Sequence, residues 1–233
     1  MRDLPPPLPP EQRTIGQLIA EAIRAYGQNF WRCLPLGMPL AIGDQLGAHH
    51  GRNVQMLIFW ALTPGFVAAY AWACRVVLGV KPTRTAIAIA VLVYLPFPAL
   101  RALFLIPGLA WFAFIGLAVP AAMVAGTGFR DSLIRGRQLG IADYAHALGS
   151  MCALVVVVGI AANVLGALLR SESDTGLRVA VFLSDLVLSP LLYLGSALLY
   201  VDQAARLISR RNAGLHPALD ADPAGRSDAQ VEP

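Results

Sequence analysis

Long runs of apolar residues, broken at only a few polar positions, dominate the middle of the chain. The longest, Ala102 to Gly126, is 25 residues without a charged side chain. About 20 apolar residues in a helix cross the roughly 30 Å hydrocarbon core of a bilayer. Three further runs have the same character: Val54 to Cys74, Ala147 to Leu169, and Val179 to Val201, which only Asp185 interrupts. The pattern therefore predicts transmembrane helices.

Two further segments are weaker candidates for spans. Phe30 to Ala48 contains charged residues and two prolines, and Thr85 to Leu100 has only 16 residues. Charge decides between five and six spans, because Lys and Arg concentrate in cytoplasmic loops. With six spans, fourteen basic residues fall on one face and four on the other, whereas with five spans the faces hold eight and ten. The sequence therefore predicts an all-α, polytopic transmembrane helical bundle of six spans over 30–201, with both termini cytoplasmic.

A helical pattern also precedes the first span. Apolar residues from Ile15 to Phe30 recur every three or four positions, and Thr14 with Gln17 fits a capping box. We expect an amphipathic helix over 14–30 that lies in the membrane interface. The alternative is a soluble helix that packs against another loop. The remaining segments are predicted as a disordered Pro-rich leader (1–13), a basic juxtamembrane segment (202–213) and a disordered tail (214–233).

The composition agrees with a membrane protein and disfavours some classes of site and partner. Only 14% of the residues are charged, against about 25% in soluble domains. The three cysteines, Cys33, Cys74 and Cys152, lie in or beside apolar runs, which favours free thiols over disulfides. Nucleic acid is not expected as a partner, because the basic residues spread along one membrane face without a recognition module.

Residues able to do chemistry are few. The adjacent histidines His49 and His50 lie near Asp44, but neighbouring residues on a helix point in different directions and make a poor pair of ligands. Metal-assisted hydrolysis needs several clustered carboxylates and histidines. We therefore predict no catalytic residue, no metal and no cofactor.

Charged residues inside the spans are better candidates for a site. Each costs roughly 2.5–3.5 kcal/mol at the centre of a helix unless it finds a partner or water. Asp44, Arg101 and Asp185 all fall toward the predicted outer side, so we expect them to form one polar cluster. Two interpretations stay open, a structural ion pair and the lining of an outward-facing cavity.

The predicted cytoplasmic loop from Arg130 to Ala145 is a second candidate. Arg130, Arg135 and Arg137 alternate there with apolar residues, a pattern that suits contact with anionic lipid headgroups. Orientation of the protein by charge alone would explain the same residues.

Three stretches carry a resemblance to a known family. They are TIGQLIAEAIRAYGQNFW, VPAAMVAGTGFRDSLIRGRQLGIADYAHALG and ALLYVDQAARL, the last with Tyr200, Asp202 and Arg206. Over roughly Thr14 to Arg210 the chain resembles a bacterial family of six-span membrane proteins of unknown function. That family groups with the membrane domain of glycerophosphoryl diester phosphodiesterases and with the YciC-like proteins. The resemblance implies a membrane architecture; the phosphodiesterase chemistry of that group belongs to a separate barrel domain, whose residues this sequence does not contain.

Together these patterns predict a multi-pass integral protein of the bacterial cytoplasmic (inner) membrane. We expect a non-enzymatic accessory or scaffold protein of the envelope. A small-solute or lipid transporter is the alternative, and an intramembrane enzyme is the third option. The expected partners are the lipid bilayer, anionic lipid headgroups, and other membrane proteins or further copies of the chain.

Overall fold

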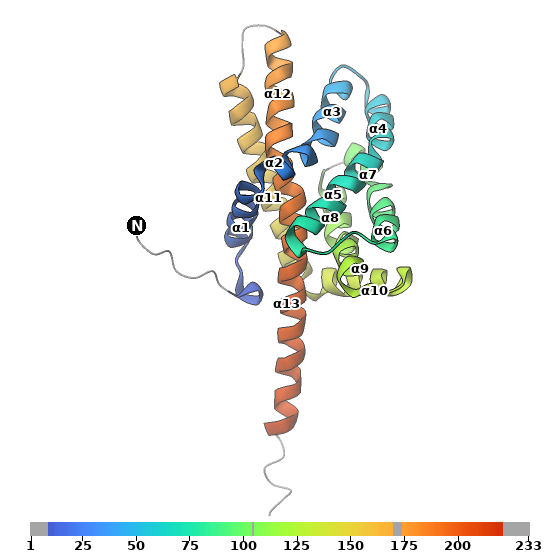
Figure 1. Cartoon of the computed structure of the whole chain (residues 1–233), viewed down its shortest axis with the longest axis vertical. Helices are drawn as coiled ribbons and strands as arrows, with labels where there is room; N and C mark the ends of the chain where they lie inside the picture. The colour runs from blue at the N-terminus through green and yellow to red at the C-terminus, as the bar shows by residue number, and fades with distance from the viewer. Residues whose placement is uncertain (1–8, 104, 170–173, 221–233) are drawn as a thin grey trace, which may run out of the picture.

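The computed structural model describes residues 9–103, 105–169 and 174–220, and describes side chains for 9–100, 106–168 and 175–211. Every regular element in these ranges is helical, which confirms the all-α class. Figure 1 shows α11, α12 and α13 as the tall part of the molecule, with the short helices α3 to α10 grouped beside them. The helices in chain order, with η marking a 3-10 helix, are η1 (Pro10–Gln12), α1 (Ile15–Gln28), α2 (Phe30–Cys33), η2 (Leu34–Gly37), α3 (Met38–Gly47), α4 (Arg52–Ala61), α5 (Thr63–Leu78), α6 (Arg84–Tyr94), α7 (Phe97–Leu103), α8 (Leu105–Ile115), α9 (Ala118–Ala125), α10 (Phe129–Ala142), α11 (Tyr144–Leu169), α12 (Asp174–Leu188) and α13 (Pro190–Asp220).

Three helical stretches are long and apolar enough to cross a membrane: Ile106–Ala125, Tyr144–Leu168 and Thr175–Arg211. A fourth is present if α4 and α5 form one span, since the two helices meet at a bend of 53°. These stretches coincide with the four long apolar runs of the sequence. The described residues therefore have the helices of a membrane protein.

The two weaker span candidates have shorter helices. Phe30 to Ala48 is divided among α2, η2 and α3, with prolines in the first turns of η2 and α3. Proline has no backbone N–H to donate and so favours the start of a helix over its interior. Arg84 to Leu100 is a shorter apolar helical stretch. A count of six spans therefore stays a prediction.

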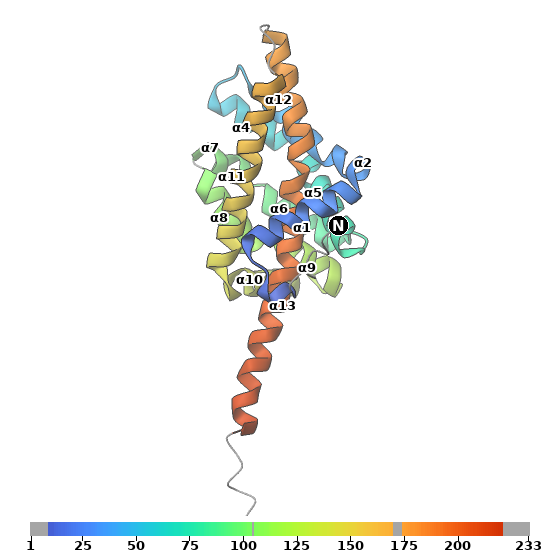
Figure 2. The ribbon, with the colours of Figure 1, turned by 90° about the vertical axis from the view of Figure 1, so that its left-hand side faces the viewer.

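α1 begins as the sequence predicts. The Thr14 side chain accepts a hydrogen bond from the Gln17 backbone N–H, and the Gln17 side chain accepts one from the Thr14 N–H, so the capping box is confirmed. The buried residues of α1 are Leu18, Ala22 and Tyr26. The helix packs against α13 and α11 (Figure 2), and its location in a membrane interface stays a prediction.

An aromatic cluster forms the core among α5, α6 and α8. The ring of Tyr94 lies 6.0 Å from those of Phe66 and Tyr70 and 5.9 Å from that of Phe112. The Tyr70 hydroxyl, fully buried, donates to the carbonyl of Gly116 at 3.2 Å. Because α8 ends at Ile115, this hydrogen bond satisfies a carbonyl at the break between α8 and α9.

Replacing Tyr70 with phenylalanine is expected to lower the free energy of unfolding by about 1 kcal/mol, because the buried Gly116 carbonyl loses the hydroxyl donor and keeps only the 3.3 Å hydrogen bond from the Val119 backbone N–H. Tyr26→Phe is the matched control. The Tyr26 hydroxyl is also buried but has no hydrogen-bond partner among the described residues, so its loss should not destabilise the protein. Unfolding of both variants in detergent checks this, and equal losses would contradict it.

α10 lies across the foot of the bundle, the end from which α13 projects (Figures 1 and 2). Its buried residues are Ser132, Gly136, Leu139 and Gly140. A Cβ at Gly140 would lie 2.7 Å from the Phe114 carbonyl oxygen, and one at Gly136 would overlap the Ala118 backbone. The two glycines therefore let the α10 backbone approach α8 and α9 more closely than any side chain would allow.

Candidate functional site

A network of charged side chains lies at the foot of the bundle and centres on α13. Asp202 is fully buried, and its Oδ1 accepts a hydrogen bond at 2.9 Å from the Arg13 guanidinium, which is 14% exposed. The two residues are 189 positions apart in the chain. This ion pair fixes the segment before α1 against the last helix.

A second ion pair joins the start of α11 to α13. Arg206 donates to Oδ2 of Asp143 at 3.1 Å, and the Asp143 side chain also accepts from the His146 backbone N–H at 3.4 Å. An aspartate in this position caps the first turn of a helix. Arg210 lies 3.7 Å from the same Oδ2 and donates to the Ala142 carbonyl. Asp143 thus both caps α11 and holds two arginines of α13.

The two pairs belong to one network. Arg206 donates through its other terminal nitrogen to the backbone carbonyl of Arg13 at 2.7 Å. Gln203, also fully buried, donates to the Asp143 carbonyl at 3.3 Å. Residues four apart lie on one face of a helix, so Asp202, Arg206 and Arg210 form a single stripe of α13 that contacts both other segments.

Several buried polar atoms of the network have no hydrogen-bond partner among the described residues: Oδ2 of Asp202, Oε1 of Gln203, Nε2 of His146, and Nε of Arg13 and Arg206. A buried polar atom left unpaired costs about 1–3 kcal/mol. The network therefore depends on its charged pairs for favourable energy. In the described part of the chain no three His, Cys, Asp or Glu side chains lie close enough together to hold a metal ion.

The predicted cluster of Asp44, Arg101 and Asp185 is only partly described. Asp44 lies on α3 and lines a pocket of about 240 Å³ with Arg52 and Gln55, whereas Asp185 lies on α12 and lines a different pocket of about 360 Å³. The side chain of Arg101, on α7, falls outside the described residues. A meeting of all three side chains stays a prediction.

The histidine pair is placed at the opposite end of the bundle. Nε2 of His49 lies 2.7 Å from a terminal nitrogen of Arg178, and Nδ1 of His50 lies 2.9 Å from the Leu46 carbonyl. Both histidines are exposed. The His49 imidazole contacts a cation here, which disfavours a metal ion at the same nitrogen.

The predicted headgroup contacts Arg130, Arg135 and Arg137 are all on α10 and all exposed. Arg137 lies over the ring of Phe114, with 5.8 Å from its guanidinium carbon to the ring centre. Arg135 lines a cavity between α10 and α13 that Tyr200 also lines. Arg137 lines a second cavity between the same two helices. Arg135 and Arg137 thus border the space between α10 and α13, whereas Arg130 lines neither of these two cavities.

None of the network residues is among the site residues that the sequence predicts. Arg13 falls in the predicted disordered leader and Asp143 in the predicted cytoplasmic loop from Arg130 to Ala145, and neither residue lies in an apolar run. Asp202 and Arg206 carried a signal, since both belong to the ALLYVDQAARL stretch. An aspartate directly after an apolar span needs a cation nearby, so the sequence of this stretch indicates an arginine partner for Asp202.

Comparisons with known proteins do not assign the network a role. No family model, no curated protein and no solved structure matches this chain. The geometry shows a buried carboxylate, Asp202, and a partly exposed one, Asp143, each paired with an arginine from a distant part of the chain, and this arrangement holds segments together.

Proposed function

We propose that the chain is a multi-pass protein of the bacterial cytoplasmic (inner) membrane, with six passes and both termini cytoplasmic. The three apolar stretches and the bent α4–α5 pair would supply four passes, and Phe30–Ala48 and Arg84–Leu100 the other two. The charge distribution supports this orientation, since fourteen of the 18 basic residues fall in the segments assigned to the cytoplasm. η1, α10 and the projecting end of α13 lie at the same end of the bundle (Figure 1), as this topology requires.

In that membrane the protein acts as a non-enzymatic accessory or scaffold protein of the envelope. The observation that carries this proposal is the complete burial of Asp202 against Arg13. A scaffold neutralises its buried charges within the fold, whereas a transporter or an intramembrane enzyme presents buried charges to a substrate cavity. The separate pockets of Asp44 and Asp185 also favour a scaffold over a transporter with one central site.

The projecting end of α13 suits a scaffold. This helix has 31 residues and is therefore about 46 Å long, and it continues well beyond the other helices (Figure 2). Ion pairs of Asp143 with Arg206 and Arg210 fix the helix where it leaves the bundle. Its far end would then present a helical surface to another membrane protein or to a second copy of the chain. The resemblance to the six-span family points to the same architecture.

Thiol accessibility tests the proposal. We expect Asp185→Cys, in a background with Cys33, Cys74 and Cys152 replaced by alanine, to resist a membrane-impermeant thiol reagent from both sides. Rapid labelling from the outer side would indicate a hydrated cavity and favour a transporter.

Two exposed positions serve as controls for orientation. His49→Cys should be labelled in intact cells and Arg84→Cys only in inverted vesicles, because the proposed topology places them on opposite sides. The reverse pattern would overturn the orientation.

A further inference from the structure

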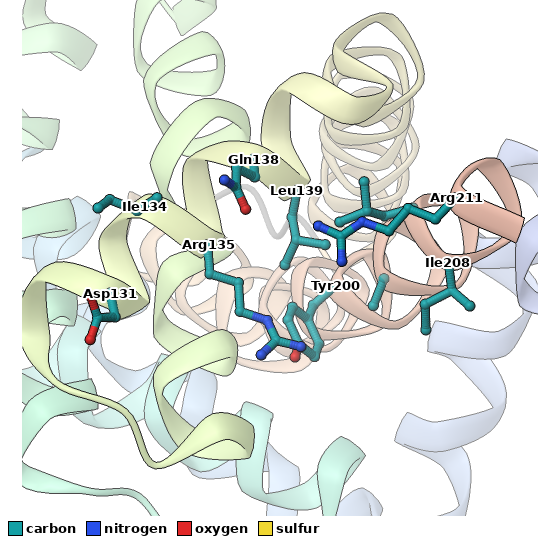
Figure 3. Close-up of a pocket in the computed structure, with 10 residues that line it drawn as sticks. Asp131, Ile134, Arg135, Gln138, Leu139, Tyr200, Ile208 and Arg211 are labelled. Carbon is teal, nitrogen blue, oxygen red and sulfur yellow. The ribbon is translucent and has the colours of Figure 1, made fainter. Parts of the chain in front are cut away.

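A groove runs between α10 and α13 on the outside of the charged network. It contains two adjoining cavities of about 310 and 490 Å³. Both are lined by Ile134 and Gln138 of α10 and by Leu207 and Arg211 of α13. Figure 3 shows Arg135 reaching from α10 toward Tyr200, and Arg211 extending toward Leu139 from the α13 side.

The groove is basic, and its charges are not neutralised within the fold. Arg135, Arg137 and Arg211 line it, against a single acidic residue, Asp131. No ion pair joins any of these arginines to a carboxylate among the described residues. Arg206, one turn from Arg210 on α13, is by contrast paired with Asp143. The groove therefore has an excess of positive charge available to an anion.

The same groove exposes large apolar side chains. Ile134, Ile141 and Ile208 are 47%, 51% and 60% exposed. A small soluble anion would leave these surfaces in water, whereas the acyl chains of a lipid would cover them. Arginine forks bind phosphate oxygens well, so the combination of basic and apolar groups matches one molecule that is both anionic and apolar.

The location also fits a lipid. α10 lies across the foot of the bundle (Figure 1), and α11, one of the apolar stretches, begins two residues after α10 ends. The groove is thus at the level where the bundle would leave the hydrocarbon core. Anionic lipids of the cytoplasmic leaflet attract basic residues at this depth.

We propose that the α10–α13 groove is a binding site for one anionic phospholipid, with its phosphodiester on Arg135 and Arg211 and its first acyl methylenes along Ile134, Ile141 and Ile208. The depth assigned to the site rests on the proposed membrane topology. The site differs from general attraction of basic residues to a charged leaflet, because it requires particular arginines on two helices. Bound lipid would join α10 to the projecting helix, and so would link lipid composition to the position of α13.

Native mass spectrometry of the full chain in detergent tests the proposal, with dioleoylphosphatidylglycerol as the probe and dioleoylphosphatidylcholine as the neutral lipid. We expect one phosphatidylglycerol to bind at least tenfold more tightly than phosphatidylcholine. The variant Arg135→Gln/Arg211→Gln should lose at least tenfold in affinity for phosphatidylglycerol. The control Lys81→Gln/Arg84→Gln removes two exposed charges outside the groove and should change the affinity less than threefold.

Three results would overturn the site. Equal losses in the two double variants would indicate diffuse attraction, and equal binding of the two lipids would indicate no headgroup selection. Competition by glycerol phosphate as strong as that by phosphatidylglycerol would indicate a site for a soluble phosphate ester. If the double variant does not fold, judged by circular dichroism, the single variants Arg135→Gln and Arg211→Gln should each lose about threefold or more.

Failure of the topology can be told apart from failure of the site. The binding assay in detergent does not depend on orientation, whereas labelling of Gln138→Cys in the groove does. Outer-side labelling of Gln138→Cys would overturn the proposed topology alone. Inner-side labelling without selective lipid binding would overturn the groove site alone.

Discussion

Asp202→Ala is expected to lower the free energy of unfolding by roughly 3–5 kcal/mol, since removal of one member of a buried ion pair leaves the other charge uncompensated. Asp202 is fully buried, and its partner Arg13 is only 14% exposed. Arg206 is tied to the same site through the Arg13 carbonyl. Removal of the Asp202 carboxylate should therefore weaken several contacts and release the segment before α1 from α13.

Thermal unfolding in detergent measures this loss, and proteolysis at the Arg13 peptide bond reports release of the segment before α1. Asp202→Asn should be destabilised less than Asp202→Ala, because the amide oxygen still accepts from Arg13. The exposed pair of Arg24 and Glu21, at 2.7 Å, supplies the control. Arg24→Ala should cost no more than about 1 kcal/mol. An Asp202→Ala loss as small as that would show that the network contributes little to the fold.

Gly136→Ala is expected to produce the second large loss, about 3 kcal/mol, at the upper end of the range for overpacking. The new methyl group would overlap backbone and side-chain atoms of Ala118 in α9. Backbone atoms cannot rotate away as the end of a side chain can, so α10 has to move as a whole. Movement of α10 would also widen the groove that Arg135 and Arg211 line, and phosphatidylglycerol binding should weaken together with stability.

Gly159→Ala, in the middle of α11, is the matched control. A Cβ at Gly159 meets nothing within 4 Å. Alanine restricts the unfolded chain more than glycine does, so this variant should be unchanged or more stable by up to about 1 kcal/mol. Chemical unfolding in detergent compares the two variants, and equal effects would refute the steric role of Gly136.

Local sequence patterns predicted most of the helical architecture. The runs at Ala147–Leu169 and Val179–Val201 correspond to α11 and to α12 with the first part of α13. Length and apolar character identify such helices because a bilayer demands both. Breaks within the other runs are expected where prolines remove a backbone hydrogen bond. Val54–Cys74 contains the 53° bend between α4 and α5, where Pro64 lies in the first turn of α5.

The C-terminal end of α13 extends further than the sequence predicts. The sequence pattern assigned 214–233 to a disordered tail, whereas α13 continues to Asp220; residues 221–233 lie outside the described ranges. Extension of an existing helix by a few residues avoids the cost of a new nucleus. The composition of a segment indicates only whether that segment would be ordered by itself. It does not include the stabilisation gained when the segment continues a helix that is already formed.

Local patterns of residues are sufficient to predict the apolar helices, the Thr14 cap of α1 and the arginines of α10. These properties depend on residues within a few positions of each other. The ion pairs of Arg13 with Asp202 and of Arg206 with Asp143 follow from the three-dimensional fold, because they depend on which helices pack together. The fold also decided that α10 and α13 border one groove. Pairing across up to 189 positions leaves no local pattern, since its energy appears only when distant segments are brought together in the fold.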